Sequence, residues 1–378
     1  MEPLNVLHIN SNYLTSKLHE NLIDKLENNG INNQIFMPMK KETISNIKYE
    51  SKHNVYNPII FKHYHRYFYT WKQAKILNTL FNQIDLSQYN LVHAHTWFTD
   101  GNVAYEIFKK TGIPYVVTIR GYTDIFNFYR KRIDLRKRGK KILDHASKII
   151  FVSQAHKNYL FDHYITDTPL RDQLKSKSHV IPNGIGQFWL ENEGKPKEIN
   201  SNRINLLSVG EIKKIKNHQF TIEAVNYLNS HSNYDFRLTI IGKTVDQKYY
   251  NLLTEKTEDT IRMIEHVTPK ELKKYYEISH IFALPSKYET FGLVYPEAMS
   301  QGLPVLYTEN QGIDKFFEEG KVGYPVKLDD VKDFCEKIHL IIHNYEQMSK
   351  NSLANFRKFN WDTISEEFIK VYKQAKGE

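Results

Sequence analysis

The feature that most constrains the fold of this chain is an alternation of short apolar segments with longer amphipathic ones, which continues over most of its 378 residues. Such a pattern is typical of buried strands that are joined by helices into a parallel sheet, and it excludes a β-sandwich or a helix bundle. In the first half we predict strands at Asn5–Ile9, Gln34–Met37, Leu91–Ala94, Tyr115–Ile119, Lys148–Val152 and His179–Ile181. In the second half we predict them at Asn205–Val209, Arg237–Ile241, Ile261–Glu265, Ile281–Leu284 and Pro304–Tyr307.

The chain is too long for one compact core, so two domains are expected. Residues 191–202 are polar and are interrupted by Gly194 and Pro196, which is typical of a linker. We therefore predict a Rossmann-like domain at residues 1–190, a linker at 191–202, a second Rossmann-like domain at 203–345, and closing helices at 346–378 that pack back toward the first domain. Two open α/β domains that face each other would leave a cleft at the ends of both sheets, where ligands bind in such folds.

Several classes of protein are excluded by what the sequence lacks. The single cysteine, Cys335, rules out a disulfide framework and a cysteine-rich zinc site, and it favours a cytoplasmic setting. No segment approaches the roughly 18 apolar residues of a membrane-spanning helix, and the N-terminus does not resemble a signal peptide. The segment after the first strand, residues 10–16, contains no G-x-G-x-x-G, and the chain has no P-loop motif. Hydride transfer and P-loop phosphoryl transfer are therefore not expected.

The strongest constellation of residues lies between 283 and 305. There a predicted strand ends at Pro285, a helix is expected to begin near Gly292, and two carboxylates, Glu289 and Glu297, stand eight positions apart. Unpaired backbone N–H groups at the start of a helix bind anions, so this junction suits a diphosphate. Glu289 could accept hydrogen bonds from sugar hydroxyls, while Glu297, which we expect more than a turn into the helix, could reach the hydroxyls of a ribose.

This segment resembles the retaining glycosyltransferases of family 4, which have the GT-B fold. A second segment, residues 206–218, resembles the strand, glycine and loop that open the second domain in that family, and weaker matches extend the resemblance over roughly residues 80–325. The resemblance implies a sugar-binding catalytic role for Glu289 and a nucleobase beside Glu265–Val267. It also implies a donor site that comprises Gly210, Lys216, Asn217, Val267, Thr290, Phe291, Gly292, Leu293 and Glu297. Neither a metal nor another cofactor is expected, because the nucleotide sugar is a substrate.

The chain departs from the family pattern at several positions. Glu211 stands where the family usually has an arginine, which makes Lys213 or Lys214 the candidate replacement. The glycine pair that many members carry after the first strand is missing. At the end of the strand Val116–Ile119, where many members have a histidine, this chain has Arg120. Arginine cannot act as a general base at neutral pH, but it can stabilise charge on a departing phosphate or orient Asp124.

His93 and His95 lie two residues apart at a strand end, so their side chains point the same way. Metal binding by this pair is one interpretation, although the sequence shows no third ligand. A cleft histidine whose hydrogen bonds are satisfied is the alternative that we favour, with His95 as the better candidate for contact with the sugar. The predicted catalytic residues are thus Glu289, Arg120, Asp124 and His95, and no metal site is predicted.

The charge of the chain is uneven. Residues 1–190 hold 26 Lys and Arg against 15 Asp and Glu, and the remainder holds 26 against 28. The segment 129–141 is especially basic, and we expect it to bind the acceptor or an anionic membrane. Its candidate residues are Arg130, Lys131, Arg132, Arg136, Lys137 and Arg138.

The sequence therefore predicts a cytoplasmic enzyme that moves a hexose-type sugar from a nucleotide diphosphate to a hydroxyl with retention of configuration. The inner face of the plasma membrane is its candidate location. The expected acceptor is a glycan or a lipid-linked sugar of a cell-surface polysaccharide or glycolipid, and no nucleic acid is expected as a partner. An epimerase or phosphorylase on the same fold is one alternative. A non-catalytic protein that binds membranes or nucleic acid through its basic half is another.

Overall fold

The computed structural model describes residues 3–40, 44, 47, 49–62, 64, 68–257 and 259–378. The chain forms two compact units. The first comprises the chain up to Val152, Lys157–Asn183 and Trp361–Glu378, and the second comprises Ser153–His156 and Gly184–Asn360. Each unit is an α/β structure around one parallel sheet, as the alternating pattern predicts.

The sheet of the first unit has seven strands in the order β4-β2-β1-β6-β7-β8-β9, and every neighbouring pair is parallel. These strands are β1 (Asn5–Ile9), β2 (Asn32–Phe36), β4 (Val55–Tyr56), β6 (Leu91–Ala94), β7 (Tyr115–Ile119), β8 (Lys148–Phe151) and β9 (Ser178–Val180). A separate pair joins β3 (Met39–Lys40) to β5 (Ile59–Phe61). The strand order reverses between β1 and β6, and the carboxyl edge at such a reversal is where open α/β sheets bind ligands.

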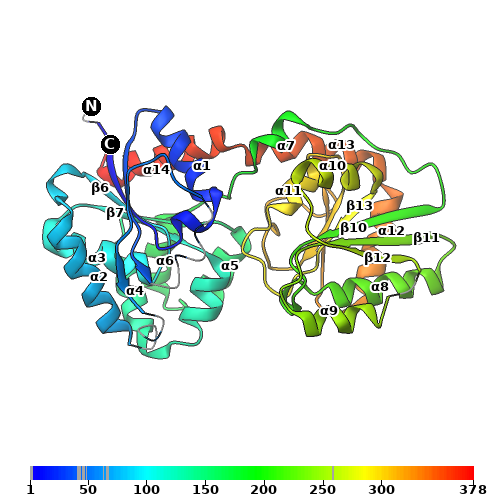
Figure 1. Cartoon of the computed structure of the whole chain (residues 1–378), viewed down its shortest axis with the longest axis horizontal. Coiled ribbons are helices and arrows are strands. Elements are labelled where there is room, and N and C mark those ends of the chain that lie inside the picture. The colour runs from blue at the N-terminus through cyan, green and yellow to red at the C-terminus, as the bar shows by residue number, and fades with distance from the viewer. Residues whose placement is uncertain are drawn as a thin grey trace. The chain divides into compact units, whose positions relative to one another are not determined.

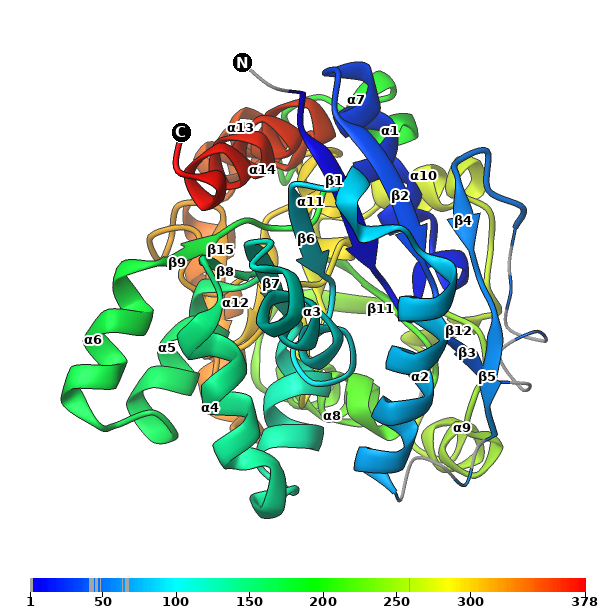
Figure 2. The ribbon, with the colours of Figure 1, turned by 90° about the vertical axis from the view of Figure 1, so that its left-hand side faces the viewer.

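Helices cover both faces of this sheet, with α1 and α14 on one face and α3 on the other (Figures 1 and 2). The spacing of Leu22, Ile23 and Leu26 on α1 turns one apolar stripe toward the strands, and Ser16 caps its first turn. The helices are α1 (Lys17–Asn28), α2 (Tyr69–Gln83), α3 (Thr99–Thr111), α4 (Arg136–His145), α5 (Gln154–His163), α6 (Thr168–Ser176) and α14 (Trp361–Lys376). Shorter helical turns are η1 (Tyr13–Thr15), η4 (Leu86–Gln88), η5 (Tyr122–Tyr129) and η6 (Ile133–Leu135).

The sheet of the second unit has six parallel strands in the order β12-β11-β10-β13-β14-β15. Successive side chains on a strand point to opposite faces, so Leu206 and Leu207 of β10 belong to two different cores. Helices α8, α9 and α12 pack on the Leu206 side, and α7, α10 and α11 pack on the Leu207 side (Figure 1). The strands are β10 (Arg203–Val209), β11 (Asp235–Ile241), β12 (Ile261–Ile264), β13 (Ile281–Ala283), β14 (Val305–Thr308) and β15 (Gly323–Val326).

The remaining helices of this unit are short to medium in length. They are α7 (Gln187–Glu191), α8 (His218–His231), α9 (Gln247–Thr254), α10 (Pro269–Ile278), α11 (Val294–Met299), α12 (Val331–His343) and α13 (Tyr345–Asn355). Two further turns are η7 (Lys214–Lys216) and η8 (Phe356–Phe359). Within the described ranges, no helix has both the length and the apolar character that crossing a membrane requires.

Two of the predicted domain boundaries are wrong. Residues 191–202 are not an open linker, because the Gly194 N–H donates to the Ser300 carbonyl at 2.8 Å and the Lys197 N–H donates to Ser349 Oγ at 2.8 Å. The chain passes between the units at Asn183–Gly184 instead. The expected block of closing helices at 346–378 is divided, since α13 packs within the second unit and α14 within the first. The predicted cleft between the two domains stays a prediction.

Candidate active site

The loop after β10 brings Lys216 and Asn217 to the carboxyl edge of the second sheet. Lys216 ends η7, and Asn217 follows in the left-handed conformation with φ of 57°. Asn217 is buried, and its Nδ2 donates to the Pro285 carbonyl at 3.2 Å. The amide thereby ties this loop to the chain that leaves β13, which is the segment that the sequence singled out.

Glu289 and Lys216 form an ion pair whose Oε2 and Nζ atoms are 2.6 Å apart. The two side chains are only 12% and 18% exposed, so solvent screens this pair less than it would a surface pair. The loop at Gln311–Gly312 fixes the backbone of the carboxylate, because the Gly312 N–H donates to the Glu289 carbonyl and the Glu289 N–H donates to Gln311 Oε1. The sequence predicted both charged residues but did not place Gln311 in the site.

Gly292 is required by the packing of its neighbours. Its φ is +85°, and an added Cβ would lie 2.3 Å from the Tyr295 ring. The following helix, α11, begins at Val294 and has only six residues, so the helix start expected near Gly292 is slightly displaced. Phe291 is buried in the core, which leaves its backbone, with those of Thr290 and Leu293, as the predicted contact with donor phosphates.

Glu297 lies in the first turn of α11. The sequence-based expectation that it lies more than a turn into the helix is therefore wrong. Burial raises the pKa of the Glu297 carboxyl to about 8, and a hydrogen bond from the Trp189 side chain opposes this rise. Trp189 belongs to α7, nearly 110 positions earlier in the chain. A lone tryptophan carried no signal in the sequence that could have linked it to this carboxylate.

A hollow of about 280 Å³ lies at the carboxyl ends of β11 and β12, close to the segment predicted to hold the nucleobase. Its lining includes Gly242, Thr244 and Glu265. Gly242 cannot carry a side chain, because an added Cβ would lie 1.9 Å from the Gly210 carbonyl oxygen. Val267 is half-buried and packs against the core beside the hollow rather than in its lining.

In the first unit, Arg120 and Asp124 lie in the turn after β7. Both Asp124 oxygens accept backbone N–H groups, from Trp97 at 3.1 Å and from Arg120 at 2.7 Å. Burial raises the pKa of Asp124 to about 7 and lowers that of Arg120 to about 10, so the guanidinium stays charged at neutral pH. The Arg120 side chain donates to the His95 carbonyl at 3.1 Å, so it is the Arg120 backbone that orients Asp124.

His95 belongs to a cluster of three buried histidines, and the third member, His8 on β1, was not apparent from the sequence. The side-chain amide of Asn33 fixes the tautomers of the His8 and His95 rings. Its Nδ2 donates to Ile31, so its Oδ1 accepts from His8 Nε2 at 2.8 Å. His8 Nδ1 then accepts from His95 Nε2 at 2.9 Å. Burial holds the pKa values of His8, His93 and His95 below their usual range, which favours neutral rings.

The candidate metal-binding nitrogens of these three rings lie within 4.8 Å of one another. However, His93 also contacts Tyr372 and Thr118, at 2.7 Å and 2.8 Å, so five of the six ring nitrogens have hydrogen-bond partners within the protein. The network is therefore complete without an ion, apart from His95 Nδ1, which is buried and has no partner in the described part of the chain.

The basic segment divides into two sets. Arg132, Arg136 and Arg138 are half-buried and bind within the protein, respectively to Asp134, to the Tyr129 and Arg130 carbonyls, and to Asn102 and Glu106. Arg130, Lys131 and Lys137 are exposed. Ile133 lies between these exposed residues in sequence, and 71% of its surface is accessible.

Comparison with protein families decides the identity of the chain. The model "Glycosyltransferase Family 4" matches residues 18–186, and the model "Glycosyl transferases group 1" matches residues 191–358. The two matches follow each other along the chain and together span most of it. The chain is a glycosyltransferase of the family-4 type. Its activity is glycosyl transfer from a nucleotide sugar, and the epimerase, phosphorylase and non-catalytic alternatives have no support.

Relatives of this glycosyltransferase include a probable sucrose-phosphate synthase from Thermosipho melanesiensis, 29% identical over 74% of this chain and 69% of the relative. A D-inositol 3-phosphate glycosyltransferase from Paenarthrobacter aurescens is 24% identical over 76% and 73%. Among solved structures, sucrose-phosphate synthase from Thermosynechococcus elongatus has a TM-score of 0.73 at 18% identity, with 98% of both chains covered. HepE from Anabaena in complex with UDP has a TM-score of 0.70 at 16% identity, with 98% and 99% covered. These structures confirm the GT-B fold.

Proposed function

We propose that this glycosyltransferase moves a hexose-type sugar from a nucleoside diphosphate to a hydroxyl of a glycan or lipid-linked sugar, with retention of anomeric configuration. The observation that carries the proposal is the Lys216–Glu289 ion pair at the carboxyl edge of the second sheet, held by the loop at Gln311–Gly312. Lys216 then neutralises a donor phosphate, and Glu289 accepts hydrogen bonds from the sugar hydroxyls. Glu297 accepts those of the ribose.

The first unit supplies the acceptor side of the reaction. The bond between the anomeric carbon and the diphosphate breaks, the acceptor oxygen forms the new bond to that carbon, and the acceptor proton leaves with the diphosphate. Arg120 stabilises the charge that develops on the leaving group, and His95 and Asp124 position the sugar and the acceptor. Because Arg120 and Lys216 supply positive charge, the proposal includes no metal or other cofactor. Activity should accordingly persist in EDTA.

Kinetics of Glu289→Gln test the proposal. The donor is first identified by thermal stabilisation with UDP, GDP, ADP and their hexose derivatives, and the complex of HepE with UDP makes UDP the first choice. We expect Glu289→Gln to bind the nucleotide within about threefold of the wild type and to lose at least 100-fold in kcat/KM, because the transferred sugar is the only part of the donor that the carboxylate contacts in this proposal. Retention is checked by the anomeric configuration of the product in ¹H NMR spectra.

The matched control is Glu277→Gln on α10. It removes a carboxylate that forms an ion pair with Lys273 at the surface of the same unit. It should leave both donor binding and kcat/KM within twofold of the wild type. Wild-type kinetics in Glu289→Gln would exclude Glu289 from the catalytic site and remove the basis of the assignment.

We further propose that the exposed residues Arg130, Lys131, Ile133 and Lys137 dock this cytoplasmic enzyme on the inner face of an anionic membrane. An exposed isoleucine among cations suits the boundary between headgroups and acyl chains. Ile133→Asp should abolish sedimentation with vesicles that contain phosphatidylglycerol. Ile278→Asp is the control, because Ile278 is 65% exposed in the second unit. Equal sedimentation of both variants would exclude this surface as the docking site.

A further inference from the structure

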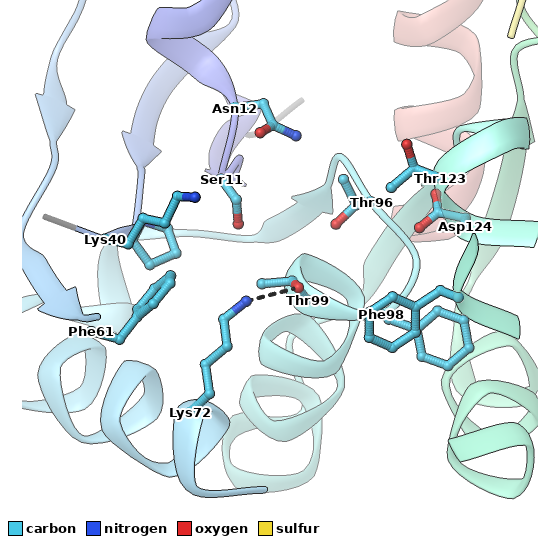
Figure 3. A pocket seen from close by; sticks show the side chains of 12 residues that line it. Ser11, Asn12, Lys40, Phe61, Lys72, Thr96, Phe98, Thr99, Thr123 and Asp124 are labelled. Carbon is cyan, nitrogen blue, oxygen red and sulfur yellow. Dashed lines mark hydrogen bonds between the residues drawn. The ribbon is translucent and has the colours of Figure 1, made fainter. Parts of the chain in front are cut away.

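A second hollow lies wholly within the first unit, at the carboxyl edge of its sheet. It has a volume of about 270 Å³ and is lined from the ends of β1, β6 and β7, beside the point where the strand order reverses (Figure 3). Open α/β sheets bind their ligands at such an edge. The volume is at the small end of the range for ligand pockets, which favours a single sugar unit over a longer glycan.

Two lysines reach this hollow from different elements, Lys40 from β3 and Lys72 from α2 (Figure 3). The Lys72 ammonium lies 4.7 Å from the centre of the Phe61 ring and donates to Thr99 Oγ1 at 3.3 Å. In the described part of the chain, neither lysine has a carboxylate oxygen within 4.0 Å. Burial lowers the pKa of Lys72 and the charge of Lys40 lowers it further, while Asp100 opposes both effects.

The positive charge at this end of the hollow is therefore not balanced by a direct ion pair. Asp100 does not line the hollow, and its carboxylate accepts hydrogen bonds from the Ser11 N–H and the Ser11 hydroxyl, while the Asp100 N–H donates to Thr96 Oγ1. A charge that is partly removed from water is costly unless a partner compensates it. The Thr99 hydroxyl also lines the hollow, and its O–H is a further donor beside the two ammonium groups, so this end offers the kind of donor set that phosphate oxygens accept from.

The other end of the hollow has the opposite character. Figure 3 shows Asp124 and Thr123 on the side away from Lys40 and Lys72. Each Asp124 oxygen already accepts one backbone N–H and retains a lone pair that a ligand hydroxyl can donate to. The hollow thus has a cationic end and a hydroxyl-accepting end.

We propose that this hollow binds an acceptor that carries a phosphate ester, with the phosphate at Lys40 and Lys72 and a hydroxyl of the acceptor at Asp124. The inference rests on the proposed function, since it names the class of acceptor that the first unit takes. The same phosphate chemistry occurs in a soluble sugar monophosphate and in a lipid-linked diphosphate, so the experiment includes both sources.

Calorimetric titration of the full chain with glucose 6-phosphate and with glucose tests the inference. Glucose 6-phosphate should bind at least tenfold more tightly than glucose, and added salt should weaken its binding. Lys40→Met and Lys72→Met should each lower this affinity at least tenfold, whereas Lys72→Arg should restore most of it. The control is Lys75→Met, one turn further along α2, where the ammonium lies over the Trp71 ring outside the hollow. It should bind within twofold of the wild type.

Farnesyl diphosphate, titrated in the same way, distinguishes the two sources. Tighter binding than glucose 6-phosphate, again lost in Lys72→Met, identifies a lipid-linked acceptor, and the reverse order identifies a soluble one. Equal affinity for glucose and glucose 6-phosphate, or phosphate binding that is unchanged in both methionine variants, would overturn the inference.

Stabilisation by nucleoside diphosphates is measured in the same variants. It should be unchanged in Lys40→Met and Lys72→Met, because the proposed donor site lies in the other unit. If these variants lose glucose 6-phosphate binding and keep nucleotide binding, the result supports the acceptor inference. If they keep both, the acceptor inference fails and the proposed function is unaffected. Absence of nucleotide binding in the wild type would contradict the proposed function separately.

Discussion

Glu297 is a carboxyl whose surroundings favour its neutral form, although its proposed role requires a negative charge. Burial raises its pKa to about 8, and the hydrogen bond from Trp189 opposes this shift only in part. A ribose hydroxyl donates most strongly to the ionised carboxylate, so donor binding should draw a proton off Glu297 when the pH lies below 8.

We predict that donor affinity rises by up to about tenfold per pH unit between pH 6.5 and 8 and then levels off. Glu297→Gln should bind the donor more weakly and should lose this pH dependence. Calorimetry in two buffers of different ionisation enthalpy measures the released proton. An equal pH dependence in the wild type and in Glu297→Gln would exclude Glu297 as the titrating group.

The pH dependence of folding stability has the opposite sign to that of donor affinity. The folded pKa lies above the unfolded value of 4.5, so ionisation of Glu297 opposes folding as the pH rises between these values. Glu297→Gln should therefore unfold at a higher temperature than the wild type at pH 9, and at nearly the same temperature at pH 4. This measurement is the control for a fold that the substitution itself disturbs.

At the scale of residues, the sequence predicted groups that are close along the chain or share a motif. Glu289 and Lys216 were both chosen from their motifs, and the structure joins them at 2.6 Å. His8 was missed and Gln311 was not placed in the site, because each reaches its partners from a separate element and the sequence does not show that contact. Arg132, Arg136 and Arg138 were chosen for their charge, although each binds within the protein.

Helix α14 belongs to the core of the first unit, although it follows the whole of the second unit in sequence. Its buried residues Trp361, Phe368 and Tyr372 pack into the same core as β1, β6 and α1 (Figure 1). The Tyr372 hydroxyl lies 2.7 Å from His93 Nδ1, so this helix also completes the histidine network.

We predict that Phe368→Ala lowers the free energy of unfolding of the first unit by about 3–5 kcal/mol, because it leaves a cavity in that core. Tyr372→Phe should cost about 1–3 kcal/mol, because it leaves a buried ring nitrogen without its partner. Denaturant titration, followed by activity and by circular dichroism, measures both. The control, Lys370→Ala, removes an exposed side chain of the same helix and should change little. A loss of stability in the second unit alone would contradict the assignment of α14 to the first unit.

At the scale of elements, strands with near-continuous apolar runs were predicted within a residue or two, because burial on both faces leaves a strong signal. The polar segment at 191–202 was misread, because its hydrogen bonds to Ser300 and Ser349 satisfy a backbone that composition alone marks as a linker. The destination of α14 was expected only in outline, since an amphipathic stripe does not specify which sheet it covers.

At the scale of the whole molecule, the second unit is nearly continuous in sequence and the first is not. We predict that a fragment of residues 184–360 folds alone and retains nucleotide binding. Residues 1–183 should not fold cooperatively until residues 361–378 are attached to them through a flexible linker. Thermal unfolding followed by circular dichroism checks each fragment. Cooperative unfolding of residues 1–183 alone would show that α14 is dispensable for that core.

The path of α14 also bears on how the chain folds during synthesis. Domains usually fold in the order in which they leave the ribosome, beginning at the N-terminus. Here the residues of the second unit are complete once Asn360 has emerged, whereas the first unit still lacks a helix of its core. The part of the enzyme that is made first is therefore finished after the second, and its unfilled core is exposed to aggregation until α14 has left the ribosome.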